Sequence, residues 1–158
     1  MNPIIFTSDA ASQLCTVLDT IKQDNVFVLC DDNTVHYCLP KIATVLSNQK
    51  EENICAPDSE FLTINLRNNT KCSIITISSG DTHKTIESLT HVWQQMQHGG
   101  ATRHSLLINL GGGMVTDLGG FAASTFKRGI RFINIPTTLL SMVDASVGGK
   151  TGINFGGL

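Results

Sequence analysis

The sequence predicts an α/β fold, a Rossmann-like and mainly parallel sheet flanked by helices, in a chain of 158 residues. Apolar runs of strand length alternate along the chain with segments whose apolar residues recur at helical spacing. The run Val26–Cys30 is apolar throughout and contains β-branched residues, as expected of a strand that is covered on both faces. Several of these runs end on glycine or aspartate clusters, and ligands of parallel sheets bind at the carboxyl ends of the strands.

The first half of the chain is expected to open with a short strand and an amphipathic helix. The predicted elements, in order, are a strand at Ile4–Phe6, a helix capped by Ser8 or Asp9 with apolar positions Leu14, Val17, Leu18 and Ile21, the strand Val26–Cys30, a helix over Thr34–Leu46, and a loop over Ser47–Asn53. Pro40 limits the first turns of the helix over Thr34–Leu46, because proline has no backbone N–H to donate.

The second half is expected to contain a hairpin and then a strand–helix–strand unit. The predicted elements are the strands Phe61–Leu66 and Cys72–Ile77 joined by the turn Arg67–Lys71, a helix that opens at Ser78–Asp81 and ends at Gly99-Gly100, the strand Leu106–Leu110, a helix of small residues after Gly111–Gly113, and the strand Phe132–Ile135 before Pro136. In the helix before Gly99, one apolar face carries Ile86, Leu89, Val92, Trp93 and Met96.

Composition excludes several classes of partner. The formal charge is −2, with 41% hydrophobic and 15% charged residues, so nothing favours nucleic acid or an anionic membrane surface. No apolar run is long enough to span a bilayer, and the first residues lack the basic and apolar regions of a signal peptide. We therefore expect a cytoplasmic protein with no nucleic-acid or membrane partner.

The cysteines and histidines do not form a recognisable metal pattern. Five cysteines occur without a C-x-x-C pair, which predicts reduced and mostly buried thiols (Cys15, Cys30, Cys38, Cys55 and Cys72). His83, Glu87 and His91 could share one helix face, but the same spacing is typical of a solvated face. We expect no metal ligands in this chain.

Gly111, Gly112 and Gly113 form the most informative turn. They lack Cβ atoms, so the backbone can adopt positive φ and approach a ligand closely, while the free N–H groups of the following helix favour an anion. The dinucleotide fingerprint is only partial, because Thr116 stands where its third glycine would be. Asp31 could supply the carboxylate for a ribose. The alternative is a glycine turn that only permits tight helix packing.

A second glycine-rich stretch ends in Gly148-Gly149-Lys150-Thr151. It does not form an ATP-binding P-loop, since Asp144 occupies the position of the motif's first glycine and no strand directly precedes it. Asp144, Lys150, Lys127 and Arg128 are the charged residues of this apolar region. They could form structural ion pairs, but with the glycine turns they favour a site for a phosphate-bearing substrate with hydroxyl groups.

The stretch of residues 111–154 resembles the signature block of the 3-dehydroquinate synthase family. It reads GGGMVTDLGGFAASTFKRGIRFINIPTTLLSMVDASVGGKTGIN. The resemblance extends back through SSGDTHKTIESLTHVW, which is similar to the family's S-G-E-x-x-K helix start, and to CDDN, which is similar to its T-D-x-N strand end. It covers nearly the whole chain, although the first residues carry little of it.

The resemblance implies that residues 1–158 are the N-terminal NAD-binding domain of a larger two-domain enzyme, whose C-terminal helical, metal-binding domain is absent from this chain. Such an enzyme converts 3-deoxy-D-arabino-heptulosonate 7-phosphate to 3-dehydroquinate and phosphate in the shikimate pathway. Its NAD is reduced and reoxidised in one turnover. A divalent metal, zinc or cobalt, would be bound outside this chain. The full-length enzyme is expected to be a homodimer, and the isolated domain to be inactive.

The family's functional positions carry over by motif. Those implied to bind the cofactor are Asp31, Asn33, Asp81, Thr82, His83, Lys84, Gly112, Gly113, Met114, Asp117, Thr137 and Thr138. Asp144 and Lys150 correspond to substrate-binding positions, and Arg128 to an arginine that reaches the phosphate in the neighbouring subunit. Asp81 replaces a usual glutamate and shortens its reach by one methylene.

Two alternatives remain open from the sequence. The cofactor block is shared by other sugar phosphate cyclases, such as inosose or valiolone synthases, and their product specificity would depend on the absent half. A protein of another class, a stand-alone nucleotide-binding module without catalysis, would carry the same turn.

Overall fold

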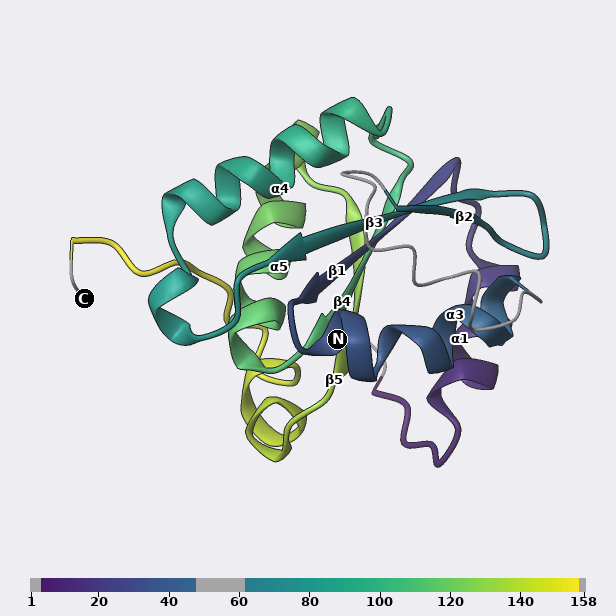
Figure 1. Ribbon diagram of the computed structural model, residues 1–158, viewed down its shortest axis with the longest axis horizontal. Helices are drawn as coiled ribbons and strands as arrows, with labels where there is room; N and C mark the ends of the chain where they lie inside the picture. The colour runs from purple at the N-terminus through teal and green to yellow at the C-terminus, as the bar shows by residue number, and fades with distance from the viewer. Residues whose placement is uncertain (1–3, 48–61, 157–158) are drawn as a thin grey trace.

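The computed structural model describes residues 4–47 and 62–156, which fold around one five-stranded sheet with helices on both faces (Figure 1). The strand order is β2-β3-β1-β4-β5, and only β2 runs antiparallel to its neighbour. The strands are β1 (Asn25–Asp31), β2 (Thr63–Asn65), β3 (Lys71–Ile77), β4 (Leu106–Gly111) and β5 (Arg131–Pro136). This confirms the predicted α/β class and its mainly parallel sheet.

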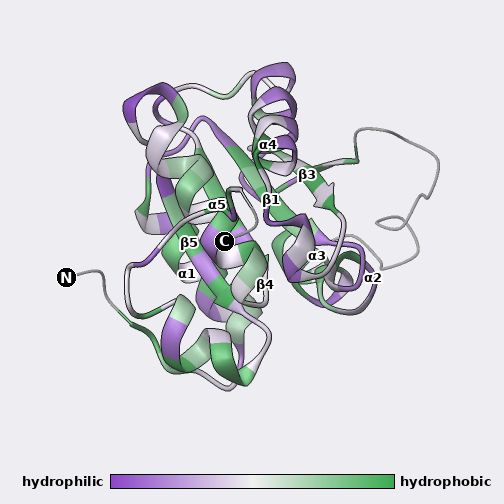
Figure 2. Ribbon diagram, turned by 90° about the vertical axis from the view of Figure 1, so that its left-hand side faces the viewer, coloured by the Kyte–Doolittle hydropathy of each residue, from purple (hydrophilic) through white to green (hydrophobic). Residues whose placement is uncertain are grey.

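Strand β1 lies in the middle of the sheet, between β3 and β4. Its residues alternate between two hydrophobic cores: Val26 and Val28 belong to one, Phe27 and Leu29 to the other. Figure 2 shows the hydrophobic colour concentrated along the central strands. A strand buried on both faces needs apolar residues at every position, which explains the continuous apolar run in the sequence.

Three helices cover one face of the sheet and two cover the other. The first group is α1 (Ala10–Thr20), α2 (Thr34–Tyr37) and α3 (Leu39–Ser47), and the second is α4 (Ile86–His98) and α5 (Gly113–Thr125). Asp9 caps α1 by accepting a hydrogen bond from the Ser12 N–H, as predicted. Residues Gly99 and Gly100 end α4, and Gly100 adopts a φ of +78°.

Two predictions for the first half were wrong. Residues Ile4–Phe6 are not a strand: their backbone pairs with no strand of the described sheet, and Phe6 is 93% exposed. The single helix predicted over Thr34–Leu46 is two helices that meet at Cys38. Pro40 has no N–H to continue the hydrogen bonding of α2 but is tolerated in the first turn of α3, so the break falls just ahead of it.

The second half follows the prediction with shifted boundaries. Strands β2 and β3 form the predicted antiparallel hairpin, although β2 covers only Thr63–Asn65. The helix expected to open at Ser78–Asp81 begins later: η2 (Asp81–His83) is a separate 3-10 turn, and Thr85 caps α4 by accepting from the Ser88 N–H. Residues 48–53 of the predicted loop and Phe61 lie outside the described residues.

After β5 the chain makes a turn of π-helix, η4 (Ser141–Ala145), that the sequence did not predict. The following segment returns along α5 to the start of α4, where the Asn154 N–H donates to the carbonyl of Lys84 at 2.7 Å. Within residues 4–47 and 62–156, no helix has both the length and the hydropathy needed to cross a membrane.

The amino ends of the parallel strands are tied together by short polar links. We call this side of the sheet the amino edge, and its central link is Asp24, whose carboxylate accepts from the hydroxyls of Thr102 and Ser105. Nearby, Asn25 donates to the Gly100 carbonyl at 3.2 Å. These bonds hold the loop before β4 against the start of β1.

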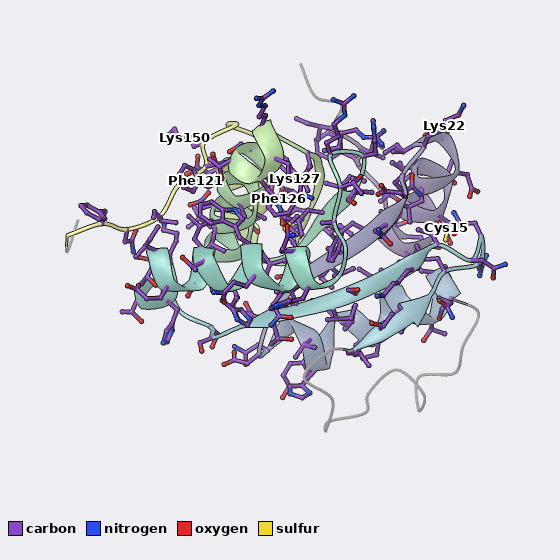
Figure 3. All side chains as sticks on the ribbon, turned by 90° about the horizontal axis from the view of Figure 1, so that it is seen from above. Cys15, Lys22, Phe121, Phe126, Lys127 and Lys150 are labelled. Carbon is purple, nitrogen blue, oxygen red and sulfur yellow. The ribbon has the colours of Figure 1, made fainter. Side chains whose placement is uncertain are left out.

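The turn between α5 and β5 also lies at the amino edge. It contains η3 (Phe126–Arg128), in which Lys127 and Arg128 have positive φ values of 47° and 73°. Lys127 donates to the Ala101 carbonyl at 2.6 Å and lies over the Phe126 ring. Figure 3 labels these two residues together. The Lys127 contacts thus anchor a backbone that L-residues rarely adopt.

Candidate functional site

The carboxyl ends of the four parallel strands meet at the opposite side of the sheet, which we call the carboxyl edge. Strands β1, β3, β4 and β5 end there at Asp31, Ile77, Gly111 and Pro136. The loops that follow them carry most of the residues singled out in the sequence. Open α/β sheets bind ligands at this edge.

The three glycines between β4 and α5 provide space for close packing and for a ligand. None of them has positive φ, so the predicted conformational reason does not apply. A Cβ at Gly111 would lie 2.5 Å from Val115 Cγ2, which the helix packing forbids. A Cβ at Gly113 would lie 3.7 Å from the Ala145 Cβ, an ordinary contact. Gly113 therefore leaves space beside the first turn of α5, and packing within the protein would also allow a Cβ there.

Lys84 lies between two carboxylates at this edge. Its Nζ is 3.1 Å from Asp81 Oδ1 and 3.4 Å from Asp117 Oδ2, which joins η2 to the second turn of α5. The sequence analysis assigned all three residues to the cofactor site, and the structure brings them into contact. One cation thus serves two acids, and the cluster carries a net negative charge.

The electrostatics of this cluster differ from one acid to the other. Burial raises the pKa of Asp117 above its ordinary value; Lys84 opposes this shift, and the nearby charges of Asp144 and Asp81 add to it. The pKa of Asp81 is lowered by the hydrogen bond from Asn154 and by Lys84. Burial works to lower the pKa of Lys84, but its contacts with Asp81 and Asp117 outweigh burial and raise it. The charged form of Asp117 is therefore less stabilised than the charged form of Asp81.

Asp31 has a local role that the sequence did not indicate. Its Oδ1 accepts the N–H groups of Asn33 and Thr34, at 3.0 and 2.7 Å, and so fixes the start of α2. No described residue donates to its Oδ2, which stays available to the hydroxyl groups of a ligand. Asn33 lies beside it as the residue that precedes α2.

The other predicted cofactor residues also lie at the carboxyl edge. Thr82 and His83 form η2, where the His83 Nδ1 is 2.7 Å from the Ser79 carbonyl. Met114 is half-buried in the first turn of α5, and the Thr137 N–H donates to the Gly111 carbonyl. Thr138 is hydrogen-bonded to the hydroxyl of the fully buried Ser141.

The three predicted catalytic residues fall in two places. Asp144 belongs to η4 and is exposed, and Lys150 is exposed on the segment beside α5, at the end of the molecule opposite Lys22 (Figure 3). Arg128 follows the other end of α5, a helix of 13 residues that spans about 20 Å. Arg128 is therefore remote from the carboxyl edge of its own chain.

Sequence reasoning missed two residues that shape this edge. Asn154 donates its side-chain amide to both the carbonyl and the carboxylate of Asp81, which is 73 positions away. Gly119 provides the close helix–strand packing that the fingerprint assigns to its third glycine, since a Cβ there would lie 2.0 Å from Asn109 Oδ1. No local pattern could reveal the first contact; the pair Gly119-Gly120 was the available signal for the second.

The two buried thiols of the described part of the chain, Cys30 and Cys72, belong to the hydrophobic core. The described cysteines are free, and burial raises the pKa of Cys72 to about 12 and shifts Cys30 in the same direction. Such thiols remain protonated and unreactive. Among the described residues, no group of three or more His, Cys, Asp or Glu side chains is arranged to hold a metal ion.

Comparisons with known sequences agree on one family. A family model described as 3-dehydroquinate synthase N-terminal matches residues 74–157. The chain is 45% identical to 3-dehydroquinate synthase of Parabacteroides distasonis over 98% of its length, and 36% identical to that of Pyrococcus furiosus over 99%. It spans 38% and 40% of the length of these two relatives.

Comparisons with solved structures support the fold. A 2-epi-5-epi-valiolone synthase from Streptomyces hygroscopicus with NAD+ and Zn2+ bound matches 98% of this chain and 39% of its own, with 23% identity and a TM-score of 0.71. A 2-deoxy-scyllo-inosose synthase complexed with carbaglucose-6-phosphate, NAD+ and Co2+ matches 90% and 35%, with 21% identity and a TM-score of 0.65. By its sequence and fold, the chain belongs to the 3-dehydroquinate synthase family.

Proposed function

We propose that this chain is the NAD-binding half of a 3-dehydroquinate synthase. The observation that carries the proposal is the convergence of the family's cofactor positions at one edge of the sheet, from Asp31 on β1 to Thr138 after β5. Two solved relatives of the same fold hold NAD+. The chain covers about two fifths of its sequence relatives, so the complete activity requires further protein.

The carboxyl edge fits a dinucleotide on its own chemistry. The N–H groups of the first turn of α5 suit a pyrophosphate, because they are unpaired within the helix and carry its positive dipole end. The room beside Gly113 lets the ligand approach this backbone. The free Oδ2 of Asp31 suits a ribose hydroxyl. Lys84, already paired with two acids, contributes orientation rather than net positive charge.

NAD would accept a hydride from the substrate and return it within one turnover. The substrate we propose is 3-deoxy-D-arabino-heptulosonate 7-phosphate, and the products are 3-dehydroquinate and phosphate. Lys150 offers an exposed ammonium to an oxyanion of this substrate, and no described residue pairs with it. Asp144 accepts a substrate hydroxyl. We propose that the ligands of the divalent metal, zinc or cobalt, lie outside this chain.

Arg128 supports a homodimeric assembly of the complete enzyme. It is exposed at the amino edge, about 20 Å along α5 from the cofactor turn, so it is too far away to serve the carboxyl edge of its own chain. We propose that it reaches the substrate phosphate bound by a second subunit. Its side chain is exposed, on a turn in which Lys127 and Arg128 both have positive φ.

A second candidate function is another cyclisation of a sugar phosphate. It is favoured by the fold neighbours, which are inosose and valiolone synthases. Their identity to this chain, 21% and 23%, is lower than the 45% and 36% of the sequence relatives. Assaying the complete protein with the heptulosonate phosphate and with hexose and heptulose phosphates separates the two. We expect turnover of the heptulosonate phosphate alone.

Gly113→Ala tests the cofactor site without disturbing the fold. The added methyl group makes only an ordinary contact with Ala145 in the protein, but it occupies the space that we assign to NAD. Calorimetric titration of this chain with NAD should show weak binding, lost in Gly113→Ala, with thermal unfolding unchanged. Ser124→Ala, at the exposed far end of α5, is the matched control and should bind as the unchanged chain does. Equal affinity in Gly113→Ala would contradict the proposal.

A further inference from the structure

Asn154 makes three hydrogen bonds to a turn that lies far from it in the sequence. Its Nδ2 donates to the Asp81 carbonyl and to Asp81 Oδ2, both at 3.0 Å. Its backbone N–H donates to the Lys84 carbonyl at 2.7 Å. The turn that contains η2 is therefore held at both of its ends by one residue.

The segment that carries Asn154 is also fixed against α5. The Gly152 N–H donates to the Asp117 carbonyl at 3.3 Å, and Thr151 packs so closely on Gly120 that a Cβ there would lie 2.4 Å from its Cγ2. Lys150 directly precedes these contacts. The segment Lys150–Asn154 thus connects the substrate lysine of the proposed function to the turn that holds Lys84.

We propose that Asn154 is a positioning residue that sets the cofactor turn Asp81–Lys84 and the substrate lysine Lys150 in one fixed arrangement. This inference rests on the proposed function and adds a residue to it. Asn154 acts through Asp81: it holds one carboxylate oxygen, which leaves the other, Oδ1, directed at Lys84. Lys84 in turn reaches Asp117 on the cofactor helix.

The chemistry of this contact requires an amide. A carbonyl and a carboxylate oxygen both need a donor, and the Asn154 NH2 group supplies two from one nitrogen. An aspartate has the same shape but donates nothing when ionised, and it would repel the Asp81 carboxylate. The charged groups that face Asp81 are Lys84 and Asp117. The Asn154 hydrogen bond is the largest influence that keeps the Asp81 pKa low.

The test compares Asn154→Ala and Asn154→Asp with the unchanged chain. NAD affinity is measured by calorimetry, and the titration of the Asp81 carboxyl by NMR. We expect Asn154→Ala to weaken NAD binding about tenfold, a change of the size of one lost hydrogen bond, and to raise the Asp81 pKa. Asn154→Asp should weaken NAD binding further and raise the Asp81 pKa further, although it preserves the shape of the side chain. If Asn154 only filled space, Asn154→Asp would instead have a smaller effect than Asn154→Ala.

The control is Asn25→Ala, which removes another asparagine amide that donates to a distant carbonyl, at the amino edge. It should change neither measure. Unaltered NAD affinity or an unaltered Asp81 titration in both Asn154 variants would overturn the proposal. If the unchanged chain did not bind NAD at all, the proposed function would fail instead. The Asp81 titration alone would then decide whether Asn154 orients this turn.

Discussion

The amino and carboxyl edges of the sheet both carry polar groups but use them differently. At the amino edge, Asp24 accepts two hydroxyl donors and Lys127 donates to a backbone carbonyl. At the carboxyl edge, Lys84 is shared by two acids, and Lys150 has no partner among the described residues. Polar groups that satisfy one another stabilise a fold, whereas polar groups left available can bind a ligand. The difference supports the carboxyl edge as the proposed binding edge.

One acid at each edge, Asp24 at the amino edge and Asp117 at the carboxyl edge, has its pKa shifted in the opposite direction to the other. Burial works to raise the pKa of Asp24, but hydrogen bonds from Thr102, Ser105 and the Asn25 N–H outweigh it and lower the pKa. At the carboxyl edge, burial dominates and the pKa of Asp117 is raised. A carboxyl group destabilised in its charged form is typical of a site that a ligand completes.

The largest expected effect is the loss of catalysis on removing Lys150. In the complete enzyme, Lys150→Ala should reduce kcat by about 100-fold, the scale seen when one stabilising donor is removed from an active site. NAD affinity should change little, because we assign most of the cofactor contact to the turn at Gly111–Gly113. Lys150→Arg should restore only part of the rate, since a guanidinium is larger and planar. Near-normal turnover with collapsed NAD binding would make Lys150 a cofactor ligand instead.

Removing Asp24 should affect stability alone. Asp24→Ala leaves the hydroxyl of the buried Ser105 without its acceptor, so the free energy of unfolding should fall by about 1.5 kcal/mol. Urea denaturation of this chain measures it. The control is Asp144→Ala at the carboxyl edge, where an exposed acid should change stability by less than about 0.5 kcal/mol. Equal losses in both variants would remove the contrast between the edges.

Replacing Arg128 by glycine should stabilise the chain while removing a proposed functional group. Its φ of 73° is unfavourable for an L-residue and ordinary for glycine. We expect Arg128→Gly to gain up to about 1 kcal/mol in urea denaturation, with impaired turnover of the complete enzyme. Arg103→Gly, an exposed arginine without positive φ, should show no gain. A loss of stability in Arg128→Gly would show that the side chain itself holds the turn.

The smallest effect is the opposite titration of the two acids. NMR of the side-chain carboxyl groups should show Asp24 titrating below 3.8, its ordinary value, and Asp117 above it. Because the folded pKa of Asp24 is lowered, its contribution to stability is complete above that ordinary value and is lost as the pH falls through the folded pKa. Asp24→Asn should therefore flatten the acid-side fall in stability. Titration of Asp24 and Asp117 both above or both below their ordinary pKa would contradict the comparison.

The sequence predicted what depends on local pattern. The strand at Val26–Cys30 was found because every position is apolar, and the glycine turn because three glycines follow an apolar run. The expected strand at Ile4–Phe6 was wrong, because a short apolar run does not show whether its backbone pairs with the sheet, and here it does not. The π-helical turn at Ser141–Ala145 was missed because its apolar residues, including the 66% exposed Val143, follow no burial pattern.

For the proposed site, the sequence nominates residues but does not show how they are arranged. Lys84 and Asp117 were both assigned to the cofactor, yet no local spacing shows that they touch across 33 positions. Of the two reasons predicted for the glycines, positive φ does not apply, and the room beside Gly113 depends on the position of Ala145. Asp31 was expected to bind a ribose, and its second use as a helix cap depends on the turn that follows it.

Mapping NAD onto this chain by NMR tests the central claim, that the carboxyl edge binds the cofactor. With the backbone amides assigned, added NAD should shift the signals of Gly112, Gly113 and Met114 and of the turn Asp81–Lys84. The signals of Asp24 and Ser105 at the amino edge should stay in place. Shifts centred on the amino edge, or no shifts at millimolar NAD, would contradict the account.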